Sequence, residues 1–290
     1  MTTPAIEKVA VLGAGTMGAG IAQVSALAGL QTRLFDVSPE RAEAGLGRIR
    51  ASLAKGVEKG KVEAEERDRA LGALEVFTEL AAACRGADLV IEAVPEDLAL
   101  KIEVLQKVAE ATGPRAVLAS NTSALSVTEL AQALPEPARV VGMHFFNPVP
   151  RMKLLEIVRA YQTSEATLAV ARAAGERMGK EVIVVQDVPG FASSRLGIAL
   201  GMEAIRMVES GVASAEEIDK AMKLGYGHPM GPLELTDLVG LDVRLAIAEH
   251  LHRELGGTQF QPPQLLKRMV KAGKLGRKTG EGFYKYPSKG

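Results

Sequence analysis

The stretch Gly13-Ala14-Gly15-Thr16-Met17-Gly18 follows the apolar run Lys8–Leu12 and opens a helical pattern over residues 16–29. A strand, a tight glycine turn and a helix in this order are typical of a dinucleotide-binding βαβ unit. Gly15 lets the backbone approach a pyrophosphate, Gly18 lets the helix pack against the strand, and the start of the helix presents free N–H groups to the phosphates. All six residues of the stretch are therefore predicted to bind a dinucleotide.

Asp36 ends the next apolar run, 18 residues after Gly18. An acid at about this spacing meets the 2′-hydroxyl of the adenosine ribose, and its charge repels a 2′-phosphate. The predicted cofactor is therefore NAD rather than NADP. Arg33 lies inside the same strand and is expected to point elsewhere. A chance glycine-rich turn is the alternative, but strand, helix, second strand and acid in this order favour the cofactor site.

The composition indicates a globular enzyme with no affinity for nucleic acid or membranes. Of the 290 residues, 35 are Lys or Arg and 35 are Asp or Glu, so no global field recruits an anionic partner. No apolar run approaches the roughly 18 residues that span a bilayer. The single cysteine, Cys84, excludes an intramolecular disulfide and fits a reducing cytoplasm; it is expected to be a buried thiol on a helix.

Apolar runs alternate with amphipathic stretches over the first two thirds of the chain. The predicted strands are residues 8–12, 31–36, 74–77, 87–94, 116–119, 139–144, 152–158 and 181–185. The predicted helices between them are residues 16–29, 39–59, 98–112, 127–134 and 165–178. This alternation predicts an α/β fold of the Rossmann type, a doubly wound and mostly parallel sheet with helices on both faces.

From Pro189 onward the strand pattern stops and only helices are predicted. They cover residues 191–209, a helix opened by the capping box Ser214-Ala215-Glu216-Glu217, and residues 233–239, 243–255 and 263–272. The chain is therefore predicted to have two domains. Residues 1–187 form the NAD-binding Rossmann-like domain with an inserted helical hairpin, and residues 188–290 form a smaller all-helical domain.

A second set of polar residues lies at a predicted sheet edge. His144 closes an apolar strand, where open α/β sheets place their ligands, and Glu156 is set in the apolar sequence Leu154-Leu155-Glu156-Ile157-Val158. A buried carboxylate is costly unless it is paired, and an imidazole would pair with it. Glu156 would then fix the tautomer of His144 and make the other ring nitrogen a general base. A core histidine and an unrelated buried ion pair fit the spacing equally well; the nearby cofactor site favours the dyad.

Several further motifs give the chain a specific family resemblance. They are Ser120-Asn121-Thr122-Ser123, His144-Phe145-Phe146-Asn147-Pro148-Val149-Pro150, Met152-Lys153-Leu154-Leu155-Glu156, Pro189-Gly190-Phe191 and Lys278-Thr279-Gly280-Glu281-Gly282-Phe283-Tyr284. With them the chain resembles the L-3-hydroxyacyl-CoA dehydrogenase family, and its short bacterial 3-hydroxybutyryl-CoA dehydrogenase branch in particular. The likeness runs through the whole chain in order.

The resemblance implies roles for the matching positions, and no metal. His144 matches the catalytic histidine, Glu156 matches its orienting carboxylate, and Ser123 matches a serine that bonds the 3-oxygen of the substrate beside the nicotinamide. The positions that match NAD contacts are Glu96, Lys101, Ser123, Asn147 and Lys278. Taken alone, Glu96 and Lys101 would be read as solvated charges at a helix start, and Ser123 as a turn residue.

One position departs from the family. Its members usually carry Asn after Pro-Gly-Phe to help bind the substrate carbonyl, whereas this chain has Ser194 there. A hydroxyl donates only one hydrogen bond and has a shorter reach. Ser194 is expected to bind substrate, directly or through water; a helix-start hydroxyl without a catalytic part is the alternative.

The helix after Asp36 carries a stripe of polar residues. Arg48, Ser52, Lys55 and Lys59 step by four, three and four residues, so they share one helical face. Such a face suits the phosphorylated tail of coenzyme A, and the family places CoA contacts at Ser52 and Lys59. Without the resemblance, an ordinary solvated face is favoured.

Together these features imply NAD-dependent interconversion of (S)-3-hydroxyacyl-CoA and 3-oxoacyl-CoA, with short chains preferred. The resemblance implies that the helical domain binds the acyl-CoA substrate and forms a homodimer. Two other functions stay open: dehydrogenation of a free hydroxy acid or sugar acid, as in the gulonate dehydrogenase and lambda-crystallin branch, and non-catalytic NAD binding. The intact set of Ser123, His144 and Glu156 argues against the last.

Overall fold

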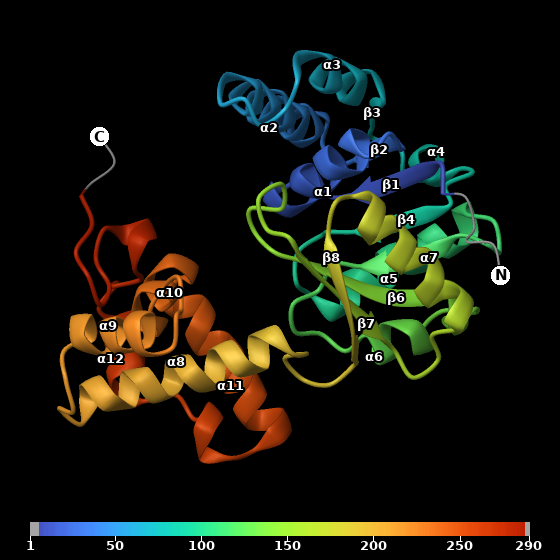
Figure 1. Ribbon diagram of the computed structural model, residues 1–290. Coiled ribbons are helices and arrows are strands. Elements are labelled where there is room, and N and C mark those ends of the chain that lie inside the picture. Colours follow the sequence, from blue (N-terminus) through green and yellow to red (C-terminus); the bar gives the residue numbers. More distant parts are fainter. Residues whose placement is uncertain (1–5, 288–290) are drawn as a thin grey trace. The chain divides into compact units, whose positions relative to one another are not determined.

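The computed structural model describes residues 6–287, which divide into two compact units (Figure 1). The first unit ends at Val188 and the second begins at Pro189. Each unit has its own hydrophobic core. None of the helices over residues 6–287 has the length and apolar character needed to cross a bilayer.

The first unit is built around one sheet of eight strands within the described residues, in the order β3-β2-β1-β4-β5-β6-β7-β8. The strands are β1 (Lys8–Leu12), β2 (Gln31–Phe35), β3 (Leu74–Phe77), β4 (Leu89–Glu92), β5 (Val117–Ser120), β6 (Val140–Phe145), β7 (Leu154–Arg159) and β8 (Glu181–Gln186). Every neighbouring pair is parallel except β6 and β7. The predicted doubly wound, mostly parallel sheet is confirmed, and each strand lies within two residues of its predicted bounds.

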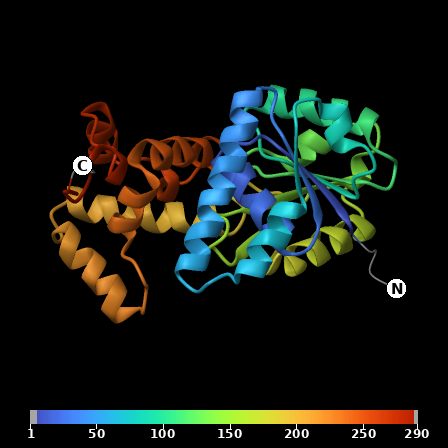
Figure 2. The same cartoon turned by 90° about the horizontal axis from the view of Figure 1, so that it is seen from above.

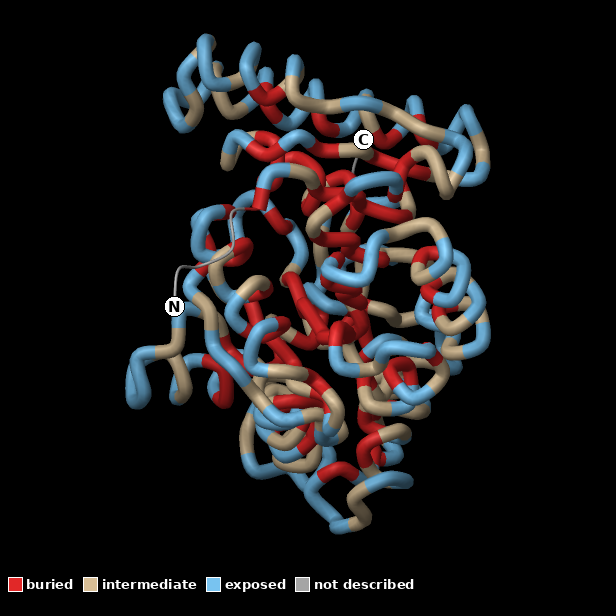
Figure 3. Tube along the Cα trace, turned by 90° about the vertical axis from the view of Figure 1, so that its right-hand side faces the viewer, coloured by how far each residue is buried: buried red, intermediate tan, exposed pale blue. Residues whose placement is uncertain are grey.

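Helices lie on both sides of this sheet (Figure 2). They are α1 (Thr16–Leu27), α2 (Pro39–Glu58), α3 (Ala64–Gly72), α4 (Leu80–Cys84), α5 (Leu98–Ala111), α6 (Val127–Gln132) and α7 (Glu165–Arg177). Because both faces are covered, every residue of β4 and β5 is buried, and the buried segments run through the middle of the unit (Figure 3). The Ser38 hydroxyl caps α2 by accepting from the Arg41 N–H, with Pro39 at the first helical position.

Two short helices of the first unit, α3 and α4, had no predicted ranges, although the sequence predicts an inserted helical hairpin and a helix that carries Cys84. Helix α3 is mostly charged and buries only Ala70, so it lacks an apolar stripe, and its capping box starts with Glu63 rather than Ser or Thr. It packs against α2 as a hairpin between β2 and β3 (Figure 1). Helix α4 ends at Cys84, which is buried as expected. Burial raises the pKa of its thiol to about 12, so the thiol stays protonated and unreactive.

The second unit is helical, as predicted. Its helices are α8 (Ser193–Glu209), α9 (Ala215–Gly225), α10 (Pro232–Val239), α11 (Leu241–Leu255) and α12 (Gln264–Lys271), with short 3₁₀ turns at Thr258–Phe260 and Arg277–Thr279. The capping box at Ser214 and Glu217 is present and starts α9. Apolar side chains from these helices form the core; they include Ile198, Met202, Ile205, Leu241, Leu251 and Leu266.

Two buried carboxylates bind the glycine-rich tail to this core. Asp237 accepts hydrogen bonds from the backbone N–H groups of Phe283 and Tyr284, each at 2.9 Å, and from the Tyr286 hydroxyl at 3.0 Å. Asp219 accepts from the Tyr284 hydroxyl at 2.7 Å. A Cβ at Gly282 would collide with the Asp237 carboxylate, so this glycine is required by packing. The tail is therefore part of the folded unit.

Because of these hydrogen bonds, the second unit should lose stability when the solution is made alkaline. Burial and the hydrogen bond to Asp237 raise the pKa of Tyr286 to about 12. Because the folded state favours the neutral phenol, this stabilisation is complete below pH 10 and is lost as the pH rises from about 10 to about 12. We expect the free energy of unfolding, measured with urea at pH 8 and pH 11, to fall less between these values in Tyr286→Phe than in the wild type. Tyr161→Phe is the control, because Tyr161 is 93% exposed. An equal fall in Tyr286→Phe and wild type would contradict the assignment.

Candidate active site

The glycine stretch forms the turn between β1 and α1, and its three glycines have different constraints. Gly13 has φ 97°, and a Cβ there would lie 2.7 Å from the Ala93 carbonyl oxygen. A Cβ at Gly18 would collide with the Gly13 carbonyl oxygen. Gly15, by contrast, has nothing within 4 Å of its Cβ position. The fold itself requires Gly13 and Gly18, while the open space at Gly15 suits the close approach of a pyrophosphate.

Asp36 lies directly beside this turn. Its Oδ2 accepts a hydrogen bond of 3.0 Å from the Ala14 N–H, and its Oδ1 accepts one of 3.3 Å from the Ser38 N–H. The glycine turn and Asp36 line a cavity of about 900 Å³, together with the end of β2 and one side of α5. The cavity and the acid fit the adenosine half of a dinucleotide without a 2′-phosphate.

Arg33 points away from this cavity, as expected. Its Nη1 donates to the carbonyl oxygens of Ala82, Ala83 and Arg85 at 3.2, 3.3 and 2.7 Å. The guanidinium also lies over the Phe77 ring, 5.5 Å from its centroid. It is therefore not placed to receive a 2′-phosphate at the Asp36 edge.

His144 and Glu156 face each other across the antiparallel pair β6 and β7. The strand register places them opposite one another, and His144 Nδ1 lies 2.7 Å from Glu156 Oε2. Glu156 is fully buried, and His144 is 7% exposed. The imidazole also contacts the Phe146 ring at a centroid distance of 4.4 Å. Because Glu156 holds Nδ1, a proton exchanged with a ligand would pass through Nε2.

Ser123 lies in a loop that a single carboxylate organises. Glu96 Oε1 accepts from the Thr122 hydroxyl at 2.6 Å, from the Ser123 N–H at 2.8 Å and from the Ser123 hydroxyl at 3.2 Å. Its other oxygen lies 3.4 Å from Lys101 Nζ. Burial alone would raise the pKa of the Glu96 carboxyl, but the Lys101 charge and these hydrogen bonds outweigh it and lower the pKa below its usual range. Glu96 is therefore ionised at neutral pH.

Lys101 is connected to a buried carboxylate that sequence reasoning missed, Glu92. Lys101 Nζ lies 2.7 Å from Glu92 Oε1 and donates to the Val94 carbonyl at 3.3 Å. Glu92 also accepts from the Ser120 hydroxyl at 2.6 Å. Both charged side chains are fully buried, so the reading of Lys101 as a solvated charge is wrong. The signal for Glu92 was available: like Glu156, it is an acid in an otherwise apolar strand.

The CoA and nicotinamide positions named from the sequence are distributed over both units. Ser52 and Asn147 line one cavity of about 160 Å³ with Arg48 and Thr16. Lys59 is exposed and lies one residue after α2 ends, as its C-cap. In the second unit, Ser194 lies in the first turn of α8, and Lys278 forms an ion pair with Asp242 at 2.5 Å.

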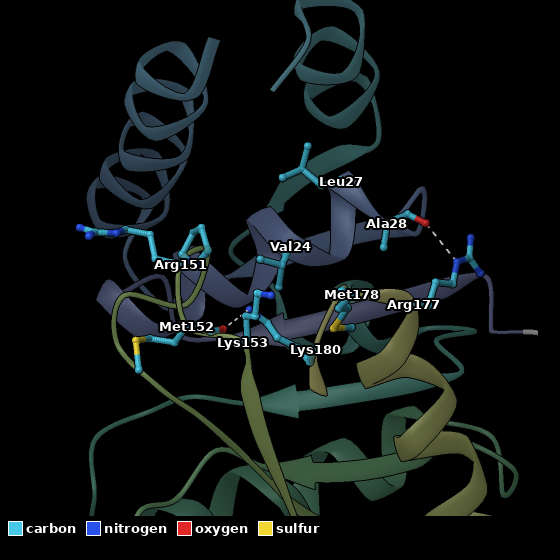
Figure 4. Close-up of a pocket in the computed structure, with 11 residues that line it drawn as sticks. Val24, Leu27, Ala28, Arg151, Met152, Lys153, Arg177, Met178 and Lys180 are labelled. Carbon is cyan, nitrogen blue, oxygen red and sulfur yellow. Dashed lines mark hydrogen bonds between the residues drawn. The ribbon is translucent and has the colours of Figure 1, made fainter. Parts of the chain in front are cut away.

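Lys180, also missed from the sequence, supports the loop between the His144 and Glu156 strands. This largely buried ammonium donates to the carbonyl oxygens of Val149 and Met152, at 2.5 and 2.8 Å. Burial lowers its pKa. Figure 4 shows Lys180 reaching toward Met152 at a cavity of about 290 Å³ between this loop, α1 and the end of α7. Lys180 thereby fixes the chain segment that carries Asn147.

Comparison with known proteins gives the family. Residues 8–188 match the NAD binding domain of 3-hydroxyacyl-CoA dehydrogenase, and residues 190–286 match its C-terminal domain. A probable 3-hydroxybutyryl-CoA dehydrogenase of Bacillus subtilis is 48% identical over 98% of this chain and 99% of its own. The 3-hydroxybutyryl-CoA dehydrogenase of Mycobacterium tuberculosis is 47% identical over 97% of this chain and 99% of its own.

Solved structures agree. The crystal structure of FadB2 from M. tuberculosis has a TM-score of 0.94 and 46% identity, covering 98% of this chain and all of its own. The (S)-3-hydroxybutyryl-CoA dehydrogenase PaaH1 from Ralstonia eutropha has the same TM-score and coverage at 40% identity. The chain therefore belongs to the 3-hydroxyacyl-CoA dehydrogenase family, with its NAD binding domain followed by its C-terminal domain.

Proposed function

We propose that the protein interconverts (S)-3-hydroxyacyl-CoA and 3-oxoacyl-CoA with NAD, and that it prefers short chains such as 3-hydroxybutyryl-CoA. The observation that carries this proposal is the His144–Glu156 pair, held at 2.7 Å in the same unit as the glycine turn. The similarity to named 3-hydroxybutyryl-CoA dehydrogenases over nearly the whole chain supports the substrate class.

The residues of this chain supply proton transfer and positioning. Held by the glycine turn and Asp36, NAD would supply the hydride acceptor for oxidation at C3, and NADH the hydride donor for reduction. His144 Nε2 takes the proton of the 3-hydroxyl in the oxidative direction and returns it to the 3-oxygen in the reductive direction. Glu156 holds the ring tautomer and stabilises the imidazolium that forms. Ser123, fixed by Glu96, offers its hydroxyl to the 3-oxygen, and Ser52, Lys59 and Ser194 bind the rest of the substrate.

For the cofactor, the proposed contacts are the glycine turn, Asp36, Glu96, Asn147 and Lys278. Lys101 acts behind Glu96, because its own side chain is fully buried. The helical second unit, beginning at about residue 188, is the proposed substrate-binding and dimerisation domain. Its exposed apolar side chains support a homodimer interface; they include Leu196, Leu224, Tyr226, Leu238 and Val243. A cytoplasmic location is also proposed, because the lone Cys84 can form no intramolecular disulfide.

A substrate comparison tests the proposal. The loss of NADH absorbance is measured with acetoacetyl-CoA, longer 3-oxoacyl-CoAs and free acetoacetate. We expect the highest kcat/KM with acetoacetyl-CoA. A preference for free acetoacetate would favour the dehydrogenase of a free hydroxy acid, and the absence of turnover with every substrate would favour a non-catalytic NAD-binding protein.

The cofactor choice depends on the Asp36 charge. We expect the preference for NADH over NADPH in kcat/KM to fall sharply in Asp36→Ala, because the repulsion of a 2′-phosphate disappears. Asp36→Asn is the matched variant: it removes the charge but retains an oxygen to accept from the Ala14 N–H. Equal use of NADPH and NADH by the wild type would refute this role of the carboxylate.

The proton chemistry depends on His144. His144→Gln should lower kcat by about 10²- to 10⁴-fold and leave NADH binding, measured by fluorescence titration, intact. Glu156→Gln should cost less and move the acidic limb of the oxidation profile to lower pH, because the imidazolium loses its counter-charge. Oxidation needs neutral His144 and reduction needs it protonated, so Glu156→Gln should lose more reductive than oxidative activity near pH 7. An unshifted profile with full activity in both directions would leave Glu156 a structural charge.

Binding of the CoA part of the substrate is proposed to depend on the polar face of α2. Lys59→Ala should raise KM for acetoacetyl-CoA while kcat and KM for NADH stay nearly constant, because contacts far from C3 contribute equally to ground-state and transition-state binding. Arg50→Ala removes an exposed cation from the same helix, outside the stripe of Arg48 and Ser52, and is the control. If both variants keep the wild-type KM, the stripe is an ordinary solvated face.

A further inference from the structure

Three charged side chains at the end of β4 form one group: Glu92, Glu96 and Lys101. Glu92 and Lys101 are fully buried, and Lys101 Nζ lies 2.7 Å from Glu92 Oε1 and 3.4 Å from Glu96 Oε2. One ammonium therefore stands between two carboxylates. All three residues belong to the first unit, where they come from β4, the first turn of α5 and the loop between them.

This group connects the cofactor cavity with the Ser123 loop. Val94, which lines the cavity of about 900 Å³, donates its N–H to Glu92 Oε1 at 2.7 Å and accepts from Lys101 Nζ at 3.3 Å. Glu96 Oε1 in turn accepts from the N–H and the hydroxyl of Ser123, at 2.8 and 3.2 Å. The charges therefore lie next to the cavity wall and next to the serine proposed to lie beside the nicotinamide.

The charges of the group do not cancel. Glu92 is the nearer acid to Lys101, and the two form a fully buried ion pair without net charge. Burial would raise the pKa of the Glu96 carboxyl, but the Lys101 charge and the hydrogen bonds of the loop lower that pKa below its usual range, so Glu96 is ionised as well. Two carboxylates and one ammonium leave one net negative charge. Without Glu92, Lys101 would neutralise Glu96, and the sum would be zero.

We propose that Glu92 sets how strongly the protein distinguishes oxidised NAD from NADH, by keeping Lys101 from neutralising Glu96. This inference rests on the proposed function, which places the nicotinamide beside Ser123. The two forms of the cofactor share the adenosine and the phosphates, and they differ in charge only at the nicotinamide ring, which is positive in oxidised NAD and neutral in NADH. A net negative charge at the Ser123 loop therefore attracts the oxidised ring alone.

The charge of Glu92 can be separated from its hydrogen bonds. Glu92→Gln keeps an oxygen for the Val94 N–H and a polar group for the Ser120 hydroxyl, but it brings the sum of the group to zero. The double variant Glu92→Gln/Lys101→Gln removes the ion pair and returns the sum to one negative charge. Asp88→Asn is the control, because it removes a carboxylate that lies at the other end of β4 and accepts from backbone N–H groups there.

The dissociation constants of oxidised NAD and NADH are measured by titration at pH 8, with thermal unfolding to verify that each variant is folded. We expect Glu92→Gln to weaken the binding of oxidised NAD about 3- to 10-fold relative to that of NADH. The double variant and Asp88→Asn should keep the wild-type ratio. Glu96→Gln leaves the buried pair intact and also brings the sum to zero, so it should shift the ratio in the same direction even if Glu92→Gln does not fold.

The inference is overturned if Glu92→Gln or Glu96→Gln keeps the wild-type ratio. It is also overturned if the double variant has the ratio of Glu92→Gln, because Glu92 would then act only through its hydrogen bonds. The titrations need no turnover, so this inference and the proposed function fail separately. Reduction of acetoacetyl-CoA by the wild type leaves the proposed function standing when the ratios do not shift, and its absence removes that function whatever the ratios are.

Discussion

A carboxylate enclosed in a sheet needs a partner, and Glu156 obtains one because β7 runs antiparallel to β6. This single reversal in an otherwise parallel sheet places His144 opposite Glu156 and fixes the imidazole. It also forces the chain between the two strands to return over α1. There a Cβ at Gly20 would lie 2.8 Å from Val149, and Lys180 holds the loop by two of its carbonyl oxygens. The close contact of α1 with the β6–β7 loop therefore follows from the same strand reversal that pairs His144 with Glu156.

A second buried carboxylate, at the end of β4, is also paired, but with different groups. Glu92 is enclosed like Glu156, but a lysine ammonium and a serine hydroxyl compensate it instead of an imidazole. Lys101 extends the network to Glu96, and Glu96 holds the loop of Ser123. The network contains two carboxylates and one ammonium, so with both acids ionised it carries one net negative charge. That charge lies behind a loop expected to face an oxidised, positively charged nicotinamide.

The features that could be predicted from the sequence are those that short stretches of the chain determine by themselves. The glycine turn, Asp36, the eight strands and most helices follow from periodicity, caps and glycine chemistry. The range of helix α3 within the predicted hairpin could not be given because the helix is charged and buries one residue, and the direction of β7 is not visible in its apolar pattern. Lys180 looks like a surface residue in the sequence, and only the return of a distant loop buries it. Contacts between remote segments, rather than local propensity, account for these misses.

The two carboxylates that hold the tail have a consequence for biosynthesis. Asp219 and Asp237 lie in α9 and α10, but their partners Tyr284 and Tyr286 come some fifty to sixty-five residues later in the chain. Until the ribosome has released those residues, Asp237 lacks its hydrogen-bond donors from the tail, and Asp219 has only the backbone N–H groups of Leu233 and Glu234. The first unit can fold during translation. The second unit can close its core only after nearly all of these residues have emerged, so nascent chains pass through a stage with one folded domain and one unfinished domain.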